Sequence, residues 1–166
     1  LTNKEMHRAQ TLMDDLCGSR RMWSQAIVRP GTPGWLEEMD RCVAEQKPIS
    51  WKGYTVGDPL SNSDFPYRLD DENLMYPAYE KMVKSGIKTF CIHKGLLPNE
   101  YADNFHAWKH AMVDDVGKAA KDWPGINFII FHSGLKPLND HPQDHLDKFK
   151  KTGRIDWVSD LAQIPA

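Results

Sequence analysis

The stretch Asn127-Phe128-Ile129-Ile130-Phe131-His132 is the most apolar run of the chain and decides its fold. A short run of aromatic and β-branched residues, with Pro124-Gly125 ending a helix-like segment just before it, is typical of a strand. The run ends directly on a polar side chain, His132. It therefore predicts a strand that carries an imidazole at its carboxyl end.

Similar strand-like segments lie upstream of this run, and helix-like segments separate them. The predicted strands are 22–28, 49–54, 87–93 and 127–132, and the predicted helices are 2–16, 33–46, about 71–85, about 107–123 and 155–163. Strands that alternate with helices in this way predict repeated β-α crossovers and a parallel sheet. The fold class is therefore α/β, built from parallel β/α units.

Two folds satisfy this pattern: an open doubly wound sheet and part of a closed TIM (β/α)₈ barrel. A complete barrel takes about 250 residues, whereas this chain has 166. The sequence has neither a GxGxxG turn nor a Walker A loop, so the nucleotide-binding forms of the open sheet would lack their phosphate site. Residues 1–166 are therefore predicted to form a single, partial TIM-barrel domain.

The composition is that of an ordinary globular protein, with 40% hydrophobic and 27% charged residues and a formal net charge of -2. No basic excess supports nucleic-acid binding. No apolar run approaches the ~20 residues that cross a bilayer, so no membrane partner is expected. Cys17, Cys42 and Cys91 are odd in number and widely spaced, and they are predicted to be reduced core residues of a cytoplasmic protein.

Each predicted strand ends in a side chain that is suited to chemistry. Arg29 follows the first strand, Lys52 and Tyr54 follow the core of the second, His93 ends the third and His132 ends the fourth. In a parallel barrel these ends meet at one mouth, where catalytic groups lie. An imidazole fixed at the end of an apolar strand suits metal ligation or general-base catalysis, so the two histidines are predicted to be functional.

Other roles remain open for the cationic residues. Lys52 is interpreted as a contact for a substrate anion, a modified metal bridge or a buried salt-bridge partner. Arg29 is equally consistent with a structural and a functional role.

Two further histidine pairs compete as metal sites because their i, i+4 spacing lets a pair on one helix share a metal. They are His106 with His110, and His141 with His145. The first pair lacks the glutamate of HExxH, and the second contains Pro142 in a polar segment. Both are predicted to be solvated. The Asp114-Asp115 pair is predicted to lie in a helix N-terminal turn or on a solvated face, with a position of one of the two at the mouth of the barrel as the alternative.

Five segments together resemble proteins of the amidohydrolase superfamily. They are Trp51-Lys52-Gly53-Tyr54-Thr55, Arg68-Leu69-Asp70-Asp71-Glu72, Ile92-His93-Lys94-Gly95-Leu96, Lys118-Ala119-Ala120-Lys121-Asp122-Trp123-Pro124 and Asn127-Phe128-Ile129-Ile130-Phe131-His132-Ser133. The resemblance is to the amidohydrolase-related branch, which includes aminocarboxymuconate semialdehyde decarboxylase and dicarboxylate lactone hydrolases. It covers nearly the whole chain, with the segments in the family's order and spacing.

The resemblance implies a place for each strand in the family's barrel. That barrel carries a His-x-His pair on strand 1, a histidine on each of strands 5 and 6, and an aspartate on strand 8. His93 resembles the strand-5 metal ligand and His132 the strand-6 histidine that acts as a general base, which makes 22–28 and 49–54 strands 3 and 4. The sequence contains no His-x-His, so the chain is expected to be an internal fragment, about strands 3–6, that is inactive alone.

The function implied by the resemblance is metal-dependent hydrolysis of an amide, lactone or related bond. A divalent metal, with zinc preferred, would bind at His93, and His132 would move the proton. Lys52, Tyr54 and Arg29 would bind a small, carboxylate-bearing substrate. Non-oxidative decarboxylation and a catalytically degenerate interaction scaffold are the alternatives, as is an open α/β binding domain without metal. A homo-oligomer is expected, because a partial barrel exposes apolar sheet edges.

Overall fold

The structure is a computed structural model that describes residues 2–57, 65–95, 109–134 and 142–164, with only the backbone of 142–145, 156, 157 and 160. Its centre is a sheet of four parallel strands in the order β1-β2-β3-β4. The strands are β1 (Gln25–Val28), β2 (Ser50–Tyr54), β3 (Thr89–His93) and β4 (Asn127–Phe131). The predicted α/β class and the parallel sheet are confirmed.

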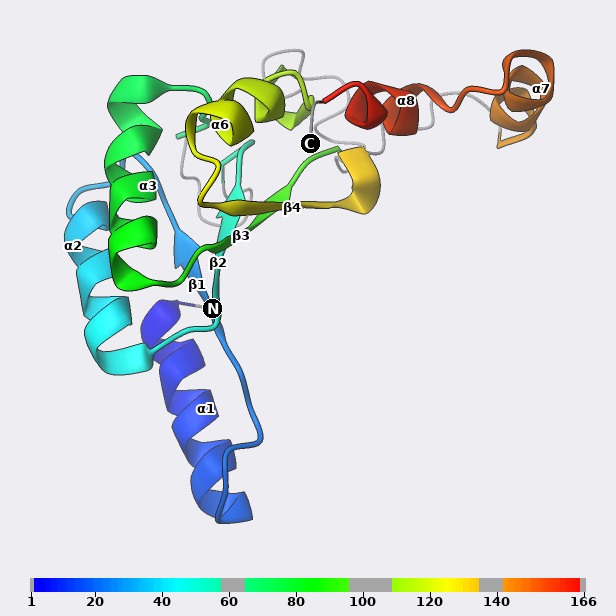
Figure 1. Cartoon of the computed structure of the whole chain (residues 1–166). Coiled ribbons are helices and arrows are strands. Elements are labelled where there is room, and N and C mark those ends of the chain that lie inside the picture. The colour runs from blue at the N-terminus through cyan, green and yellow to red at the C-terminus, as the bar shows by residue number, and fades with distance from the viewer. Residues whose placement is uncertain (1, 58–64, 96–108, 135–141, 165–166) are drawn as a thin grey trace.

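The sheet is wound in one direction, since each strand pairs with the strand that follows it in the chain. Helices α2 (Trp35–Arg41), α3 (Glu72–Ser85) and α6 (Val116–Asp122) lie along one face (Figure 1). The opposite, concave face of the strands is left open in the described part of the chain (Figure 1). A doubly wound sheet would instead reverse its strand order and place helices on both faces.

The remaining elements extend from the ends of this layer. They are α1 (Asn3–Cys17), the π-helical turn η1 (Cys42–Gln46), the 3₁₀ turn η2 (His132–Gly134), α7 (Pro142–Thr152) and α8 (Asp156–Ala162). Helix α1 begins with a capping box between Thr2 and Glu5 and ends at Gly18, whose φ of 61° is the left-handed conformation that favours glycine. Local capping residues therefore fix this helix as the sequence predicts.

The hydrophobic core lies between the sheet and the helices that cover it. Alternate residues of a strand face opposite sides, and the registers align Ala26, Trp51, Phe90 and Phe128 on the covered side. The first three are fully buried, as is Tyr79 of α3, whose ring contacts Phe90 and Phe128. Burial of such large aromatic side chains supplies much of the stabilisation of a domain of this size.

Gly53 lets the core close tightly against β2. A Cβ atom at this position would overlap the Tyr67 hydroxyl and the ring of Phe90. Only glycine allows this approach, which is a common reason for a glycine within a strand. The loop that contains Tyr67 is therefore packed directly onto the carboxyl half of β2.

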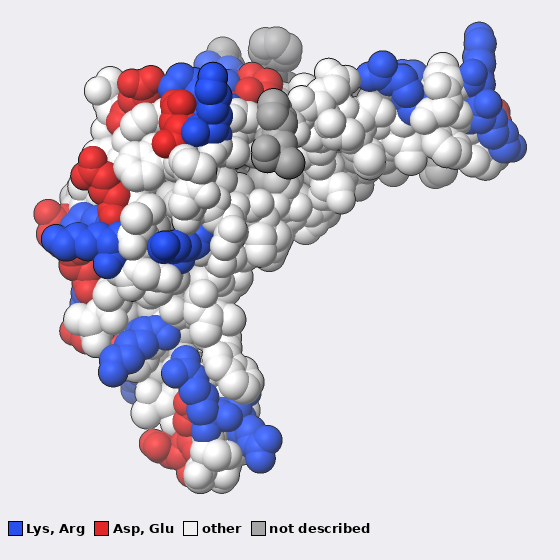
Figure 2. Space-filling model, in the orientation of Figure 1, with Lys and Arg blue, Asp and Glu red and all other residues white. Residues whose placement is uncertain are grey.

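Charged side chains are distributed unevenly over the surface. Lys, Arg, Asp and Glu gather over α1, α2, α3 and α6 and around α7 (Figure 2). The concave side between α1 and α8 is almost free of charge in the same view (Figure 2). On the open side of the sheet, Ile129 of β4 remains 45% exposed, so this apolar face is not covered by the described residues.

Three sequence predictions of element boundaries are wrong, each for a local reason. The predicted strand 22–28 starts only at Gln25, because the backbone N–H groups of Arg21 and Met22 donate to the Asp14 side chain of α1. The predicted helix 107–123 is interrupted, and α6 starts only at Val116. The polar segment around Pro142, for which no helix is predicted, forms α7, and Pro142 as its first residue suits a helix start.

The predicted core location of the cysteines is confirmed for two of them. Cys42 and Cys91 are buried, whereas Cys17 is exposed at the end of α1, and all three are free thiols in the described residues. No described helix combines the length and the apolar character required to span a bilayer.

Candidate functional site

The carboxyl ends of β2, β3 and β4 bring functional side chains together on the open face. Tyr54, the last residue of β2, pairs in register with His93, the last residue of β3. His93 pairs in turn with Phe131, the last residue of β4. Because all three strands run in the same direction, these side chains form one row at the end of the sheet.

His93 and His132 are in direct contact. The Nε2 atom of His132 lies 3.2 Å from the Nδ1 atom of His93, and the ring centroids are 4.5 Å apart with the planes at 62°. One nitrogen must donate and the other accept, because a hydrogen bond between imidazoles requires complementary tautomers. The two rings therefore share one proton between the facing nitrogens, which is a suitable arrangement for proton transfer.

The backbone of His132 explains how it reaches His93. Regular strand alternation would place it on the covered face, opposite to Phe131. Instead His132, Ser133 and Gly134 have φ of 58°, 50° and 67°, and this left-handed turn directs the imidazole back over the open face. The conformation costs about 1–2 kcal/mol for a non-glycine residue, and backbone strain of this kind is concentrated at functional sites.

Lys52 lies next to this pair, between two aromatic rings. Its Nζ atom is 4.4 Å from the ring centroid of Tyr54 and 4.2 Å from that of Phe131. The residue is only 7% exposed, and its hydrogen bond to the carbonyl of Gly53 is long, at 3.4 Å. Burial lowers the pKa of Lys52 to about 8.

Two effects oppose each other at this amine. The lowered pKa corresponds to a cost of roughly 3 kcal/mol for holding the charge in this place. A cation–π contact favours the charged form by about 0.5–2 kcal/mol. The cost of desolvation is the larger, so part of the Lys52 population is a neutral amine near neutral pH.

Four rings form a row beside Lys52 that we term the aromatic collar: Tyr54, His93, His132 and Phe131. Successive ring centroids around it are 5.6 Å apart for Tyr54 and His93, 4.5 Å for His93 and His132, and 6.1 Å for His132 and Phe131. The Lys52 ammonium lies over the rings at the two ends of this row, Tyr54 and Phe131. Sequence reasoning missed Phe131, because it is one of several apolar residues of its strand and only the register reveals its position.

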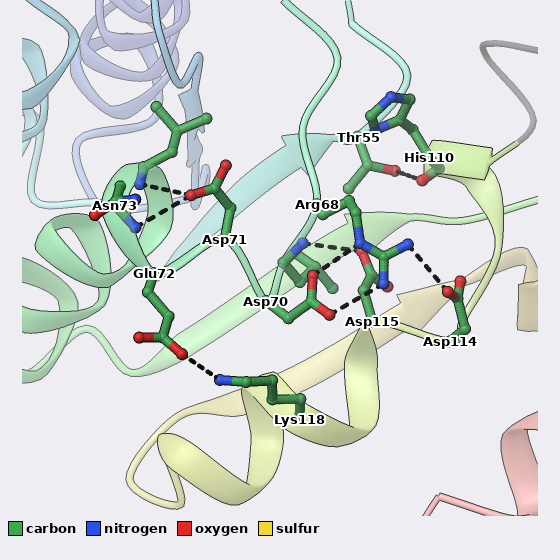
Figure 3. A network of polar contacts seen from close by, with 12 residues as sticks. Thr55, Arg68, Asp70, Asp71, Glu72, Asn73, His110, Asp114, Asp115 and Lys118 are labelled. Atoms are coloured by element: carbon green, nitrogen blue, oxygen red, sulfur yellow. Dashed lines mark hydrogen bonds and ion pairs between the residues drawn. The ribbon is translucent and has the colours of Figure 1, made fainter.

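A buried polar network supports the collar from the loops behind it, and Figure 3 shows one part of this network, the bond between Thr55 and the carbonyl of His110. The Thr55 hydroxyl lies 3.2 Å from the backbone carbonyl of His93 and 2.5 Å from that of His110. The Lys94 ammonium donates to the same carbonyl of His110, at 2.9 Å, and to the Asp115 carboxylate, at 2.7 Å. These bonds tie the backbone on either side of His93 to neighbouring loops.

The Lys94–Asp115 pair is completely buried, with side-chain exposures of 0% and 1%. The same carboxylate oxygen of Asp115 accepts the backbone N–H of Leu69. Burial lowers the pKa of Lys94, and the charge of Asp115 acts in the opposite direction. The predicted position at a helix N-terminus is confirmed for Asp115, which is the N-cap of α6, although its side chain is buried rather than solvated. Asp114 is exposed and pairs with Arg68.

Arg29 lies in a different environment from the other predicted site residues. It lines a cavity of about 340 Å³ near the end of β1 together with Asn3, Thr32, Trp35 and Glu38. No residue of the aromatic collar lines this cavity. The structure thus groups Lys52, Tyr54, His93 and His132 at the carboxyl end of the sheet. Arg29 instead lines the separate cavity near the end of β1.

The competing histidine pairs are described only in part. His110 is half-buried rather than solvated, and burial lowers its pKa. Its backbone carbonyl accepts hydrogen bonds from the Thr55 hydroxyl and the Lys94 ammonium. His106, His141 and the side chain of His145 lie outside the described residues.

The spacing of the histidine pair fits two ligands of one metal ion. Zinc binds imidazole nitrogens at about 2.0–2.1 Å in tetrahedral geometry, which separates two such nitrogens by about 3.3 Å. The facing nitrogens of His93 and His132 are 3.2 Å apart. Within the described residues, however, no group of three or more His, Cys, Asp or Glu side chains has the arrangement of a metal site.

Comparison with protein-family models, with curated proteins and with solved structures finds no match to this chain.

Proposed function

We propose that the chain forms part of a (β/α)₈ barrel of the amidohydrolase kind. Two features of the fold support this proposal. The strands follow one another in a single direction, and the described helices beside them lie on one face (Figure 1). A closed barrel requires both features, because its helices form an outer ring and its inner face is reserved for side chains.

The observation that carries the functional proposal is the contact between His93 and His132. It places two imidazole nitrogens 3.2 Å apart at the carboxyl ends of adjacent parallel strands. Catalytic groups of β/α barrels lie at this end of the strands. The proposed function is hydrolysis of an amide, a lactone or a related bond with the assistance of a divalent metal.

His93 would hold the metal, and His132, whose Nε2 lies 3.2 Å from the Nδ1 of His93, would be the general base. A divalent ion, for which zinc matches imidazole ligands best, would supply Lewis-acid polarisation of the scissile carbonyl and lower the pKa of a bound water to about 7. His132 would accept a proton and return it to the leaving group, because the pKa of an imidazole lies near neutrality.

The other collar residues would bind the substrate. Lys52 contributes a positive charge for a substrate carboxylate, through its protonated form. Tyr54 contributes a ring that borders both Lys52 and His93. A small molecule that bears a carboxylate next to its scissile bond is thus the substrate class that this site would select.

Zinc affinity of the whole chain, measured by isothermal titration calorimetry, tests the proposal. His93→Ala should weaken zinc binding at least about tenfold, because it removes a ligand of the ion, whereas His132→Ala, which removes the proposed general base, should change the zinc affinity less. His7→Ala is the control, since His7 lies on α1, away from the collar, and should leave the affinity unchanged. Equal affinity in all variants would refute a metal at the collar.

A further inference from the structure

Two lysines of the described residues, Lys52 and Lys94, are deeply buried, and their surroundings differ. Lys94 is held by the Asp115 carboxylate and by the carbonyl of His110. Lys52 is 7% exposed and takes part in no ion pair among the described residues. A buried ammonium without a carboxylate is unfavourable, so the two residues are suited to different tasks: Lys94 to structure, Lys52 to chemistry.

We infer that Lys52 is a nucleophilic amine that captures flat, conjugated carbonyl compounds as imines within the aromatic collar. This activity goes beyond the proposed hydrolysis and requires no metal.

The groups that face Lys52 come from every strand of the sheet. Its neighbours in register are Ile27 on β1 and Cys91 on β3. Tyr54 and Phe131 contribute the rings on which the Nζ atom rests. None of these side chains is a carboxylate, and the Cys91 thiol is a titratable group that acts on the charge of Lys52. The lowered pKa of Lys52, about 8, is the consequence of this apolar setting.

The proposed step is balanced without any redox partner. The neutral amine of Lys52 attacks the carbonyl carbon, and the carbonyl electron pair moves to oxygen, which takes up a proton. The resulting carbinolamine loses water, and a carbon–nitrogen double bond replaces the carbon–oxygen double bond. Lysines that are desolvated in apolar pockets are activated for this reaction, because their neutral form is more abundant.

The collar indicates which carbonyl compounds the amine would take. The rings of Tyr54 and Phe131 lie against Lys52, and the imidazoles of His93 and His132 complete the rim. Aromatic rings at these separations favour a flat partner that stacks or packs edge to face. A conjugated aldehyde would therefore be preferred over a saturated one of similar size.

Reductive trapping of the imine tests this inference on the intact wild-type chain. The protein is treated at pH 7 with benzaldehyde and sodium cyanoborohydride, which delivers hydride to the imine carbon and makes the adduct permanent. Peptide mapping by mass spectrometry then locates each modified lysine. Because the neutral fraction of an amine with a pKa of about 8 exceeds that of an exposed lysine on the order of 100-fold, Lys52 should be modified at least about tenfold faster than exposed lysines such as Lys84.

Three comparisons accompany the mapping. Cyclohexanecarbaldehyde should modify Lys52 more slowly than benzaldehyde does. Lys52→Met should abolish the fast phase, and Lys84→Met should preserve it. If the labels were spread over exposed lysines with Lys52 unmodified, the inference would be wrong whether or not the Lys52→Met protein folds. Equal rates with the two aldehydes would refute the preference for conjugated carbonyls.

Discussion

At the scale of single residues, the site depends on side chains that are placed at a cost. His132 adopts a left-handed conformation at φ 58°, directly before Ser133 at φ 50°. Lys52 is buried between aromatic rings without an ion pair in the described residues. Strain and desolvation that do not stabilise the fold are typical of residues that are retained for function.

The burial of Lys52 predicts a pH-dependent stability. Its pKa is about 8 in the folded chain, against 10.5 for the ordinary value. Between these pH values the unfolded state binds more protons than the folded state, so the free energy of unfolding of the wild type rises with pH across this window. Lys52→Met removes this dependence, and its stability relative to the wild type should fall by up to roughly 3 kcal/mol between pH 7 and pH 10.

Urea denaturation at the two pH values measures this difference. Lys84→Met is the matched control, because Lys84 is exposed on α3 and its replacement should produce no such change. If the difference in free energy of unfolding between Lys52→Met and the wild type were the same at pH 7 and pH 10, the Lys52 ammonium would not be destabilised by burial.

The sequence is sufficient to find the strand-end residues but not all of their neighbours. Lys52, Tyr54, His93 and His132 are recognisable because polar groups interrupt or follow apolar strands, and the parallel register then brings them together. Asp115 is not recognisable, because its partner Lys94 is 21 residues away in the chain. A pair formed by tertiary contact leaves no local pattern in the sequence.

At the scale of elements, the loops after β2 and β3 are locked together behind the site. Thr55 follows β2, Lys94 follows β3, and Asp115 directly precedes α6. The same contacts explain why the predicted helix 107–123 is interrupted: the Asp115 side chain turns inward to Lys94 and Leu69 before α6 begins. The start of α1 can be predicted because its capping residues, Thr2 and Glu5, lie next to each other in the sequence. The interruption before α6 cannot be predicted in this way, because it depends on tertiary contacts of Asp115.

The buried pair predicts strong coupling between its two members. Lys94→Met or Asp115→Asn should each lower the free energy of unfolding by about 3–5 kcal/mol, because each leaves a buried charge without its partner. The double variant Lys94→Met/Asp115→Asn should lose clearly less than the sum of the two single losses, since neither charge remains.

Chemical denaturation of the single and double variants gives the coupling energy. The exposed pair of Lys118 and Glu72, with side-chain exposures of 46% and 63%, provides a control cycle in which the coupling should be much smaller. Additive losses at Lys94 and Asp115 would mean that the pair does not hold the loops together.

At the scale of the whole molecule, the chain has one covered and one open sheet face. The covered face packs on α2, α3 and α6, and the open face carries the collar and a surface almost free of charge (Figures 1 and 2). Parallel sheets are normally covered on both faces. The predicted partial barrel and the predicted homo-oligomer both account for an apolar open face, and both remain predictions.

We propose a metal at His93, at the end of this open face, and nitrogen-detected NMR can examine it in the chain labelled with ¹⁵N-histidine, recorded with and without one equivalent of zinc. A ring nitrogen of His93 should move to a metal-bound shift, whereas the ring nitrogens of His132, whose Nε2 lies 3.2 Å from the Nδ1 of His93, should keep the shifts of an uncoordinated imidazole. If both nitrogens of His93 kept their shifts while other histidines changed, the collar would not be a metal site.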